Sequence, residues 1–258
     1  INFKLSWTTE FANEIVKRNI KIKWSDSANT RVGNRDMYQA MAASGCVKLW
    51  YGTETASPRI LKEIDKWSNN LPESIHNTLT WSHEAGIWNG VNIIVNFPHE
   101  TAEEYEMLKN FLGDYYNKGI VNSFSVNWLA IFNPSAMYAH PERHKIKLDR
   151  TTPMEPRGNQ AAYGWKWEEL DSNGNICTTS KEINKRGRYR HANALEYLNI
   201  PKENLNTGDM CWIFENDYLF FSLVQLYGHD ILKKKEVYHY IISKYNTDKR
   251  YSGINRFA

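Results

Sequence analysis

The sequence has few cysteines, and no two of them are close together. Cys46, Cys177 and Cys211 are widely separated and form no Cys-x-x-Cys pair. Small secreted domains that depend on disulfides have more cysteines at regular spacings, so we expect no disulfide framework here. The expectation that follows is a reducing, cytoplasmic setting.

Long apolar runs and a strong net charge are also missing. No run approaches the roughly 18 apolar residues that a membrane span requires, and no signal-peptide pattern opens the chain. The net charge is only +3, which does not favour a nucleic-acid partner. We interpret the basic run Lys233 to Lys235 as a solvated helix face. The sequence therefore predicts neither a membrane nor a nucleic-acid partner.

The sequence is rich in aromatic residues. They make up 14% of its 258 residues and include ten Trp. Aromatic side chains bury large areas in a core, but they also line ligand pockets, so their number does not choose between these roles. A chain of this length can bury a substantial core in one large domain or two small ones.

Helical and strand patterns alternate between residues 8 and 132. The expected helices cover residues 8–18, 34–45, 57–64, 72–84 and 101–112, and the expected strands cover residues 20–24, 47–51, 91–95 and 124–132. Asn34, Ser57 followed by Pro58, and Thr101 followed by Glu104 are typical helix starts. Alternation of this kind predicts a parallel sheet or barrel with right-handed crossovers.

The pattern changes after Asn133 and Pro134. Residues 141–190 are polar and rich in turn formers, with a hairpin expected around residues 171–175. Helical spacing returns from Tyr189 onward, notably in residues 217–226 and 231–245. We therefore predict two parts, residues 1–146 and a mostly helical C-terminal region of residues 147–258.

Functional residues of parallel α/β folds lie in the loops after the carboxyl ends of the strands. Three such loops are expected here, at residues 25–31, 52–55 and 96–101. They contain polar and charged side chains, and we take them as the candidate site.

The strand ends resemble the radical S-adenosylmethionine superfamily. Gly45-Cys46 and Gly52-Thr53-Glu54-Thr55 are similar to the "GC" and "GxES" elements of that family, and Ile60-Leu61 and Lys66 to its helix closing on Lys or Arg. Gly86-Ile87 and the segment from Asn92 to Thr101 resemble "aGi … n-x-I-v-G-f-P-g-E-T". The segment from Phe132 to Tyr138 resembles the "PGS-x-l-y" stretch after the sixth barrel strand. The order and spacing match the subgroup often fused to a cobalamin-binding domain.

The resemblance covers about residues 8–146 and implies a fold and an activity. The implied fold is an α/β partial TIM-like (β/α) barrel, strands three to six, followed by the mainly helical region. The intact protein would cleave S-adenosylmethionine reductively at a [4Fe-4S] cluster and begin radical chemistry on an unknown substrate. The implied cofactors are S-adenosylmethionine, the cluster and, for this subgroup, cobalamin.

The chain departs from the family at the cluster. The family motif Cys-x3-Cys-x2-Cys is absent, and the three cysteines present cannot supply it. By this registration strands one and two are missing, so we expect the chain alone to be inactive and to retain no cofactor. No metal ligand and no catalytic residue is assigned. The expected partners are the missing N-terminal segment, or a second copy, covering the open barrel edge.

The resemblance implies roles for individual residues. Glu54 would contact the ribose hydroxyls of S-adenosylmethionine, for which an ionised carboxylate is a strong acceptor. Lys66 would reach the methionine carboxylate or the ribose, and Asn92 would face the ribose. Arg31 or Ser27 would hold the carboxylate.

The adenine would be flanked by the backbone of Val95, Asn96 and Phe97. Asn96 replaces the family's usual Gly, which would put a side chain near the adenine, and Thr55 replaces the usual Ser.

Each assignment has a structural alternative. Glu54 can cap the helix that begins near Ser57, Lys66 can be a cation at a helix C-terminus, and Arg31 can pair with a nearby acid. Asn92 is harder to explain without a partner, because a buried amide needs hydrogen bonds.

Other residues receive structural interpretations. His140 and His144 have a metal-like spacing without a third ligand, and we interpret them as loop residues. Cys46 is expected in the core, and Trp165 and Trp167 are expected to pack from one strand face.

Two rival functions remain open at this point. One is a non-catalytic, barrel-derived binding or assembly module. The other is a different α/β enzyme that shares only the strand-end motifs.

Overall fold

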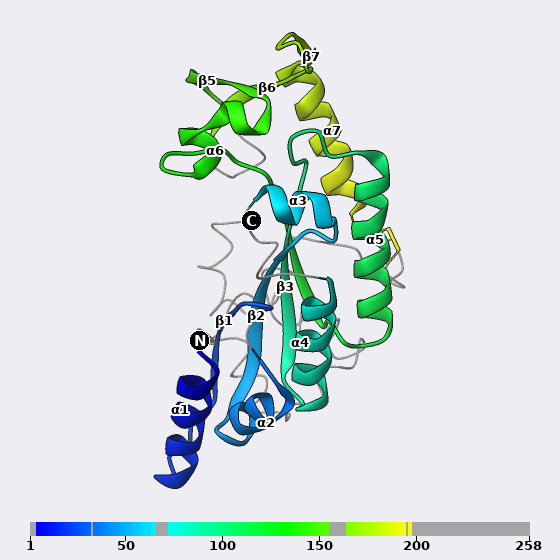
Figure 1. The fold of residues 1–258 in the computed structure, drawn as a ribbon. Coiled ribbons are helices and arrows are strands. Elements are labelled where there is room, and N and C mark those ends of the chain that lie inside the picture. Colours follow the sequence, from blue (N-terminus) through cyan, green and yellow to red (C-terminus); the bar gives the residue numbers. More distant parts are fainter. Residues whose placement is uncertain (1–3, 32, 65–71, 155–163, 195, 198–258) are drawn as a thin grey trace, which may run out of the picture.

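The structure is a computed structural model that describes residues 4–31, 33–64, 72–154, 164–194 and 196–197. Its centre is a four-stranded parallel sheet with strand order β1-β2-β3-β4 (Figure 1). The strands are β1 (Trp24–Ala28), β2 (Cys46–Glu54), β3 (Trp88–Val95) and β4 (Ser123–Trp128). The predicted α/β class with a parallel sheet is therefore confirmed, and the strands lie in the sheet in the order of the chain.

Helices alternate with these strands as the sequence predicts. They are α1 (Leu5–Lys17), α2 (Arg35–Ala43), α3 (Pro58–Glu63), α4 (Pro72–Glu84) and α5 (Ala102–Asn117). The Asn34 side chain accepts a hydrogen bond from the Met37 amide at 2.9 Å and caps α2. Thr101 and Glu104 form a reciprocal capping box at the start of α5. Both predicted helix starts are confirmed.

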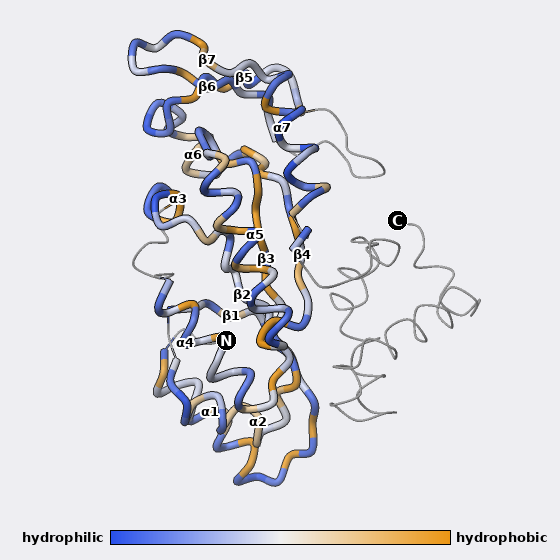
Figure 2. Tube along the Cα trace, turned by 90° about the vertical axis from the view of Figure 1, so that its right-hand side faces the viewer, coloured by the Kyte–Doolittle hydropathy of each residue, from blue (hydrophilic) through white to orange (hydrophobic). Residues whose placement is uncertain are grey.

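One face of the sheet forms the main core with the helices. Leu49 and Tyr51 of β2 and Val91 and Ile93 of β3 belong to a buried cluster that also contains side chains from α1 to α5, namely Ala12, Met41, Leu61, Leu79 and Leu108. Figure 2 shows hydrophobic residues concentrated along β3 and β4. Each fully buried Leu, Ile, Val or Met side chain contributes about 1.5–3 kcal/mol to the stability of the fold. The helices α1–α5 therefore lie on the same face.

The residues that alternate with these core residues along the strands point to the other face of the sheet. Gly52 pairs in register with Asn92, and Asn92 pairs with Ser125. Paired residues of parallel strands point to the same face, so these three form one row. This row is polar, although the same face also carries Trp50, Trp88 and Ile94.

A second, antiparallel sheet lies beyond the carboxyl ends of the parallel strands (Figure 1). It follows α6 (Ala136–Ala139) and the 3₁₀ helix η1 (Pro141–His144), and consists of β5 (Ile146–Pro153), β6 (Trp165–Leu170) and β7 (Ile176–Thr178). The predicted hairpin around residues 171–175 joins β6 and β7. Trp167 packs in a core that also includes Ile60 and Phe97, so this sheet is continuous with the strand ends below it.

Helix α7 (Ser180–Asn193) returns from this sheet and lies beside α5 (Figure 1). The Tyr105 hydroxyl donates to the Arg190 carbonyl at 2.7 Å. A Cβ at Gly187 would lie 1.8 Å from Nε1 of Trp128, so only glycine permits this approach of α7 to β4. The polar segment 141–190 was predicted as turn-rich, yet it contains most of this well-formed helix.

Several predicted boundaries are wrong. The first strand is Trp24–Ala28 rather than residues 20–24, because pairing with β2 begins at Trp24 and overrides the weak strand propensity of the residues that follow. β2 continues through Gly52 to Glu54, α5 extends to Asn117, and β4 ends at Trp128.

Some predictions are not tested by the fold. The boundary at residue 146 stays a prediction, and the helices expected at residues 217–226 and 231–245 lie outside the described residues. In the described part of the chain, no helix has the length and hydropathy needed to cross a membrane.

Candidate functional site

Two neighbouring strands end in a left-handed residue. Glu54 at the end of β2 has φ 65°, and Asn96, directly after β3, has φ 69°. Residues other than glycine rarely adopt this conformation, which costs about 1–3 kcal/mol and is concentrated at functional sites. The register of β2 against β3 shifts between Gly52 and Glu54, which is a bulge that redirects the Glu54 side chain. The sheet therefore presents Glu54 and the residues after β3 at one edge.

The capping alternative for Glu54 is wrong. The residue that caps α3 is Ser57, whose Oγ accepts a hydrogen bond from the Ile60 amide at 3.2 Å. Thr55 Oγ1 accepts the Ser57 amide at 3.2 Å and completes this turn. The carboxylate of Glu54 does not serve as the N-cap of this helix.

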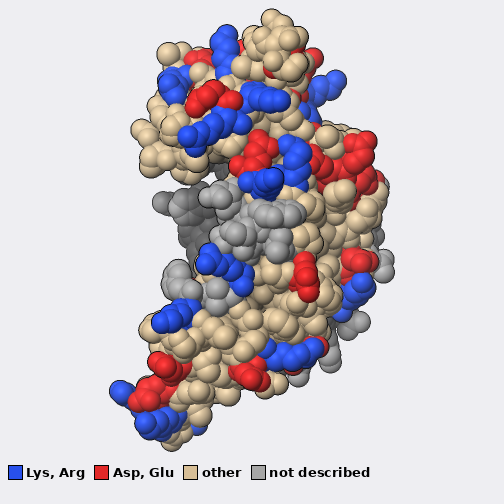
Figure 3. All heavy atoms as spheres, viewed as in Figure 1, with Lys and Arg blue, Asp and Glu red and all other residues tan. Residues whose placement is uncertain are grey.

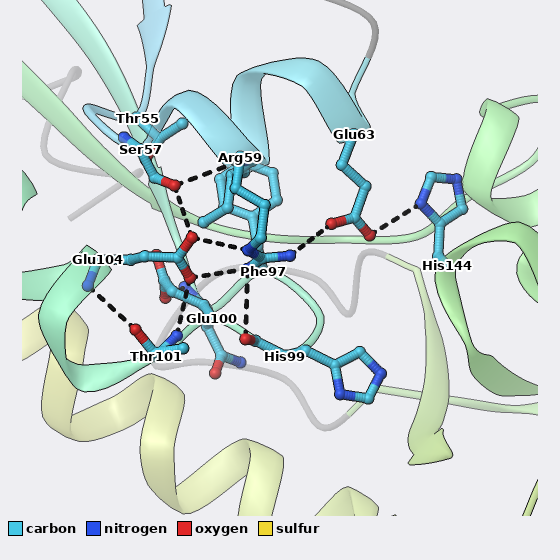
Figure 4. Close-up of polar contacts among 12 residues, drawn as sticks. Thr55, Ser57, Arg59, Glu63, Phe97, His99, Glu100, Thr101, Glu104 and His144 are labelled. Carbon is cyan, nitrogen blue, oxygen red and sulfur yellow. Dashed lines mark hydrogen bonds and ion pairs between the residues drawn. The ribbon is translucent and has the colours of Figure 1, made fainter. Parts of the chain in front are cut away.

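Arg59 and Glu104 connect the two helices that follow these strands (Figure 4). Nε and Nη2 of Arg59 each donate to a Glu104 carboxylate oxygen at 2.7 Å. Glu104 also accepts from the Ser57 hydroxyl at 2.7 Å and from the Thr101 amide at 3.0 Å. Burial alone would raise the pKa of Glu104, but the hydrogen bonds from Arg59, Ser57 and Thr101 outweigh it and lower the pKa to about 2. The starts of α3 and α5 are thus tied together.

The buried carboxylate of Glu100 stabilises the loop after β3. Its side chain is fully buried and accepts a hydrogen bond from the Asn96 amide at 2.8 Å. Arg190 of α7 forms an ion pair with the same carboxylate and donates to the carbonyls of Glu100 at 2.9 Å and Thr101 at 3.1 Å. Burial raises the pKa of Glu100, and the charge of Arg190 opposes that shift. The loop conformation therefore depends on a cation from a distant helix.

Arg186, one turn before Arg190, fixes the other side of the loop. Its Nε donates to Asn96 Oδ1 at 2.7 Å, and its Nη2 donates to Glu169 Oε1 at 2.7 Å. The amide of His99 donates to the same Glu169 oxygen at 2.7 Å. The Asn96 side chain is also bonded to the Ile183 carbonyl at 3.3 Å, so it is directed to α7.

Neither arginine was predicted from the sequence as a functional residue. Their spacing of four residues in a helical pattern was a usable signal, because it places two cations on one helix face.

The structure brings some of the predicted residues together. Glu54, Asn92 and the backbone of Val95, Asn96 and Phe97 come from the adjacent ends of β2 and β3, and Asn92 is the register partner of Gly52. Val95, Asn96 and Phe97 are buried, whereas Glu54 and Asn92 are partly exposed. These residues form the central part of the candidate site.

The other predicted residues are more peripheral. Ser27 was expected in the loop after the first strand but lies inside β1, paired with Trp50, and is exposed. Arg31 is exposed beyond the end of β1, and its amide donates to Asn29 Oδ1 at 2.9 Å. Lys66 lies outside the described residues. The ligand roles of these residues stay predictions.

The remaining candidates have structural surroundings. Nδ1 of His140 lies 3.4 Å from Glu142, and Nδ1 of His144 lies 3.2 Å from Glu63. Within the described ranges, no group of three or more His, Cys, Asp or Glu is placed to hold a metal ion. Cys46 lies in the main core as expected, where burial raises the pKa of its thiol.

The chain resembles known proteins in sequence over part of its length and in fold over most of it. No model of a known protein family matches the chain. An uncharacterized methyltransferase of Pyrococcus horikoshii, PH0819, is 31% identical over 97 residues, which are 38% of this chain and 21% of that protein.

Two solved structures of the radical S-adenosylmethionine methyltransferase TsrM from Kitasatospora setae resemble the chain. The form with cobalamin and a [4Fe-4S] cluster has a TM-score of 0.54 at 14% identity, covering 91% of this chain and 49% of that one. The form with tryptophan and a S-adenosylmethionine analogue has a TM-score of 0.50 at 14% identity, covering 79% and 42%.

These likenesses show the fold. The chain is similar in fold to a radical S-adenosylmethionine methyltransferase, and it spans less than half the length of that enzyme and about a fifth of the curated relative.

Proposed function

We propose that the chain is part of a radical S-adenosylmethionine enzyme of the cobalamin-associated type, and that β1–β4 are strands three to six of its barrel. One observation carries this proposal: the strands lie in chain order, and α1–α5 share one face of the sheet. Successive right-handed crossovers without a reversal of strand order build a barrel wall with helices outside. A doubly wound sheet reverses its order and has helices on both faces.

A row of polar residues on one face of the sheet supports this assignment. In a barrel, the face without helices points inward, and its carboxyl end carries the site. Asn92 and Ser125 lie in one row on that face, and Asn127 donates to the Ser125 hydroxyl at 3.1 Å. A row of amide and hydroxyl groups is suited to a polar ligand rather than to core packing.

The described residues fit S-adenosylmethionine. Glu54 would accept hydrogen bonds from the ribose hydroxyls, and Asn92 would donate to or accept from the ribose. The backbone of Val95 to Phe97, held by Glu100 and Arg186, would flank the adenine. Arg31 or Ser27 would hold the methionine carboxylate. Lys66, which lies outside the described residues, is proposed to reach the methionine carboxylate or the ribose.

The described cysteines do not fit a [4Fe-4S] cluster. Cys46 is buried in the main core and Cys177 is exposed on β7, so these two thiols come from separate parts of the fold. We assign no cluster ligand to this chain and derive no step through the cluster. In the intact enzyme, the cluster would supply the electron that cleaves S-adenosylmethionine. Cobalamin is proposed only as a further cofactor of the intact protein.

The position of β1 is compatible with a partner. β1 is the terminal strand of the parallel sheet in the described structure, and a terminal strand is where a further strand is added to a sheet. The proposed partner is the N-terminal part of the same enzyme, which would supply the two preceding strands, with a second copy of the chain as the alternative.

A second candidate function follows from the cysteines. Neither described thiol is suited to a cluster. The alternative to the enzyme is therefore that the chain is a non-catalytic, barrel-derived binding or assembly module. The two candidates differ in whether S-adenosylmethionine binds.

Calorimetric titration with S-adenosylmethionine tests the proposal. The chain alone is not expected to retain the cofactor through purification, but it should bind added S-adenosylmethionine saturably. Glu54→Ala should weaken this binding at least about tenfold, as expected for lost hydrogen bonds to a charged group. Glu73→Ala changes an exposed glutamate at the start of α4 and serves as the matched control. Absence of saturable binding, or equal loss in both variants, would favour the binding-module alternative.

A further inference from the structure

A cavity of about 450 Å³ lies outside the S-adenosylmethionine site. It is bounded by α3, the loop that contains His99, the end of η1 and the β6–β7 hairpin. None of the described residues that are proposed to contact S-adenosylmethionine lines it. Its volume is within the range of roughly 300–1,000 Å³ that is typical of small-molecule sites.

The two carboxylates that line this cavity already have donors. Glu63 accepts from Arg59 Nη1 at 2.8 Å and pairs with His144 Nδ1 at 3.2 Å (Figure 4). Asp171 accepts from the amides of Asn173 at 2.8 Å and Asn175 at 2.9 Å, and these hydrogen bonds keep the pKa of Asp171 low. Both carboxylates are therefore held in place by neighbouring donors, and Glu63 is paired with the Arg59 cation.

Two cations of the cavity wall are not committed in this way. Arg143 and Lys145 line the cavity and are exposed, and no carboxylate of the described chain forms an ion pair with either side chain. Figure 3 shows basic and acidic side chains gathered between α3 and the antiparallel sheet. The wall thus holds three cationic side chains, Arg59, Arg143 and Lys145, against the carboxylates of Glu63 and Asp171, and Arg143 and Lys145 form no ion pair within the described residues.

The backbone that carries these cations is anchored. Lys145 has a left-handed conformation with φ 49°, and its carbonyl accepts from the Leu170 amide at 2.8 Å. Nε2 of His99 lies 3.2 Å from the same carbonyl and must carry the proton, because a carbonyl only accepts. A binding site needs such fixed supports for its charged groups.

We propose that this cavity binds the phosphate group of a small phosphorylated molecule. A phosphate monoester carries about −1.5 to −2 charges near pH 7, which matches the two cations. Its oxygens accept several charge-assisted hydrogen bonds, and a guanidinium can donate two of them at once. The volume leaves space for the organic part of the ligand. This proposal is independent of S-adenosylmethionine binding.

Titration with inorganic phosphate at constant ionic strength tests the charge requirement. The double variant Arg143→Ala/Lys145→Ala should bind phosphate more weakly by about fivefold for each cation removed, the effect of one unit charge at 4 Å in water. Lys17→Ala/Arg18→Ala removes the same charge from exposed positions of the chain at α1 and should bind as wild type does. Equal weakening in both double variants would show diffuse attraction and overturn the proposal.

Cys177 reports on the place of binding. Its exposed thiol lines the cavity, so bound phosphate should slow its alkylation by iodoacetamide. Peptide mass spectrometry follows this cysteine separately from the others. We expect protection in the wild-type chain and loss of protection in Arg143→Ala/Lys145→Ala. An alkylation rate in the wild-type chain that saturating phosphate does not change would contradict the proposed location.

Discussion

Arg59 and Glu104 form a two-point ion pair, with Nε–Oε1 and Nη2–Oε2 distances of 2.7 Å each. The pair joins α3, which follows β2, to α5, which follows β3. It lies directly outside the strand ends that bear Glu54 and Asn96. The two helices are consequently held in one arrangement by a planar guanidinium, and the loops before them are held with them.

Replacing Arg59 by lysine should destabilise the protein. A lysine keeps the charge but cannot make the two-point contact, and a partly buried hydrogen bond to a charged group contributes about 1.5–3 kcal/mol. Urea unfolding should show a loss in that range. Arg18→Lys changes an exposed pair with Glu14 and should cost no more than about 1 kcal/mol. Equal losses in the two variants would contradict a structural role for the Arg59 contact.

The lowered pKa of Glu104 predicts that part of the free energy of unfolding is lost in acid. The pKa of Glu104 is lowered from 4.5 to about 2 in the folded chain. The unfolded chain therefore takes up a proton first as the pH falls. The stabilisation is complete above about pH 4.5 and is lost as the pH falls through 2. Urea unfolding between pH 7 and pH 2 should show the stability difference between wild type and Glu104→Gln shrinking over that window. A difference that stays constant with pH would contradict this assignment.

Arg190 should be among the most sensitive positions outside the main core. Arg190→Met leaves Glu100 buried without its cation, a change that typically costs about 3–5 kcal/mol. Adding Glu100→Gln to this variant should recover part of the loss, because the uncompensated charge is removed. Both effects are measured by urea unfolding. Lys185→Met on the exposed side of α7 is the control, and a similar cost there would show that the ion pair is unimportant.

The chain should bind no iron–sulfur cluster by itself. Anaerobic reconstitution with iron and sulfide should give no brown chromophore after gel filtration, because neither Cys46 nor Cys177 is placed to share a cluster. A stable chromophore that survives filtration would overturn this prediction. Its loss in Cys177→Ser would then identify a ligand.

Local signals predicted most of the parallel sheet. Asn34, Ser57 and Thr101 cap their helices as the sequence indicated, because capping needs only residues that are near in the chain. β1 was misplaced because its small polar residues are in a strand only through pairing with β2.

The support of the candidate site was less predictable. Arg186 and Arg190 contact residues that are 90 positions away in the chain, and no local pattern encodes such a contact. The bulge at the end of β2 is likewise set by its register with β3. Motif resemblance pointed to Glu54 and Asn92, whereas the network that holds their surroundings became visible only in three dimensions.

Photochemical labelling tests the central claim most directly. S-adenosylmethionine with a radioactive methyl group is irradiated with the chain, and the labelled peptide is identified by mass spectrometry. The account predicts label on the segment from Asn92 to Thr101, suppressed by excess unlabelled S-adenosylmethionine and much reduced in Glu54→Ala. Label confined to other segments, or label that excess S-adenosylmethionine does not suppress, would contradict a nucleotide site at the ends of β2 and β3.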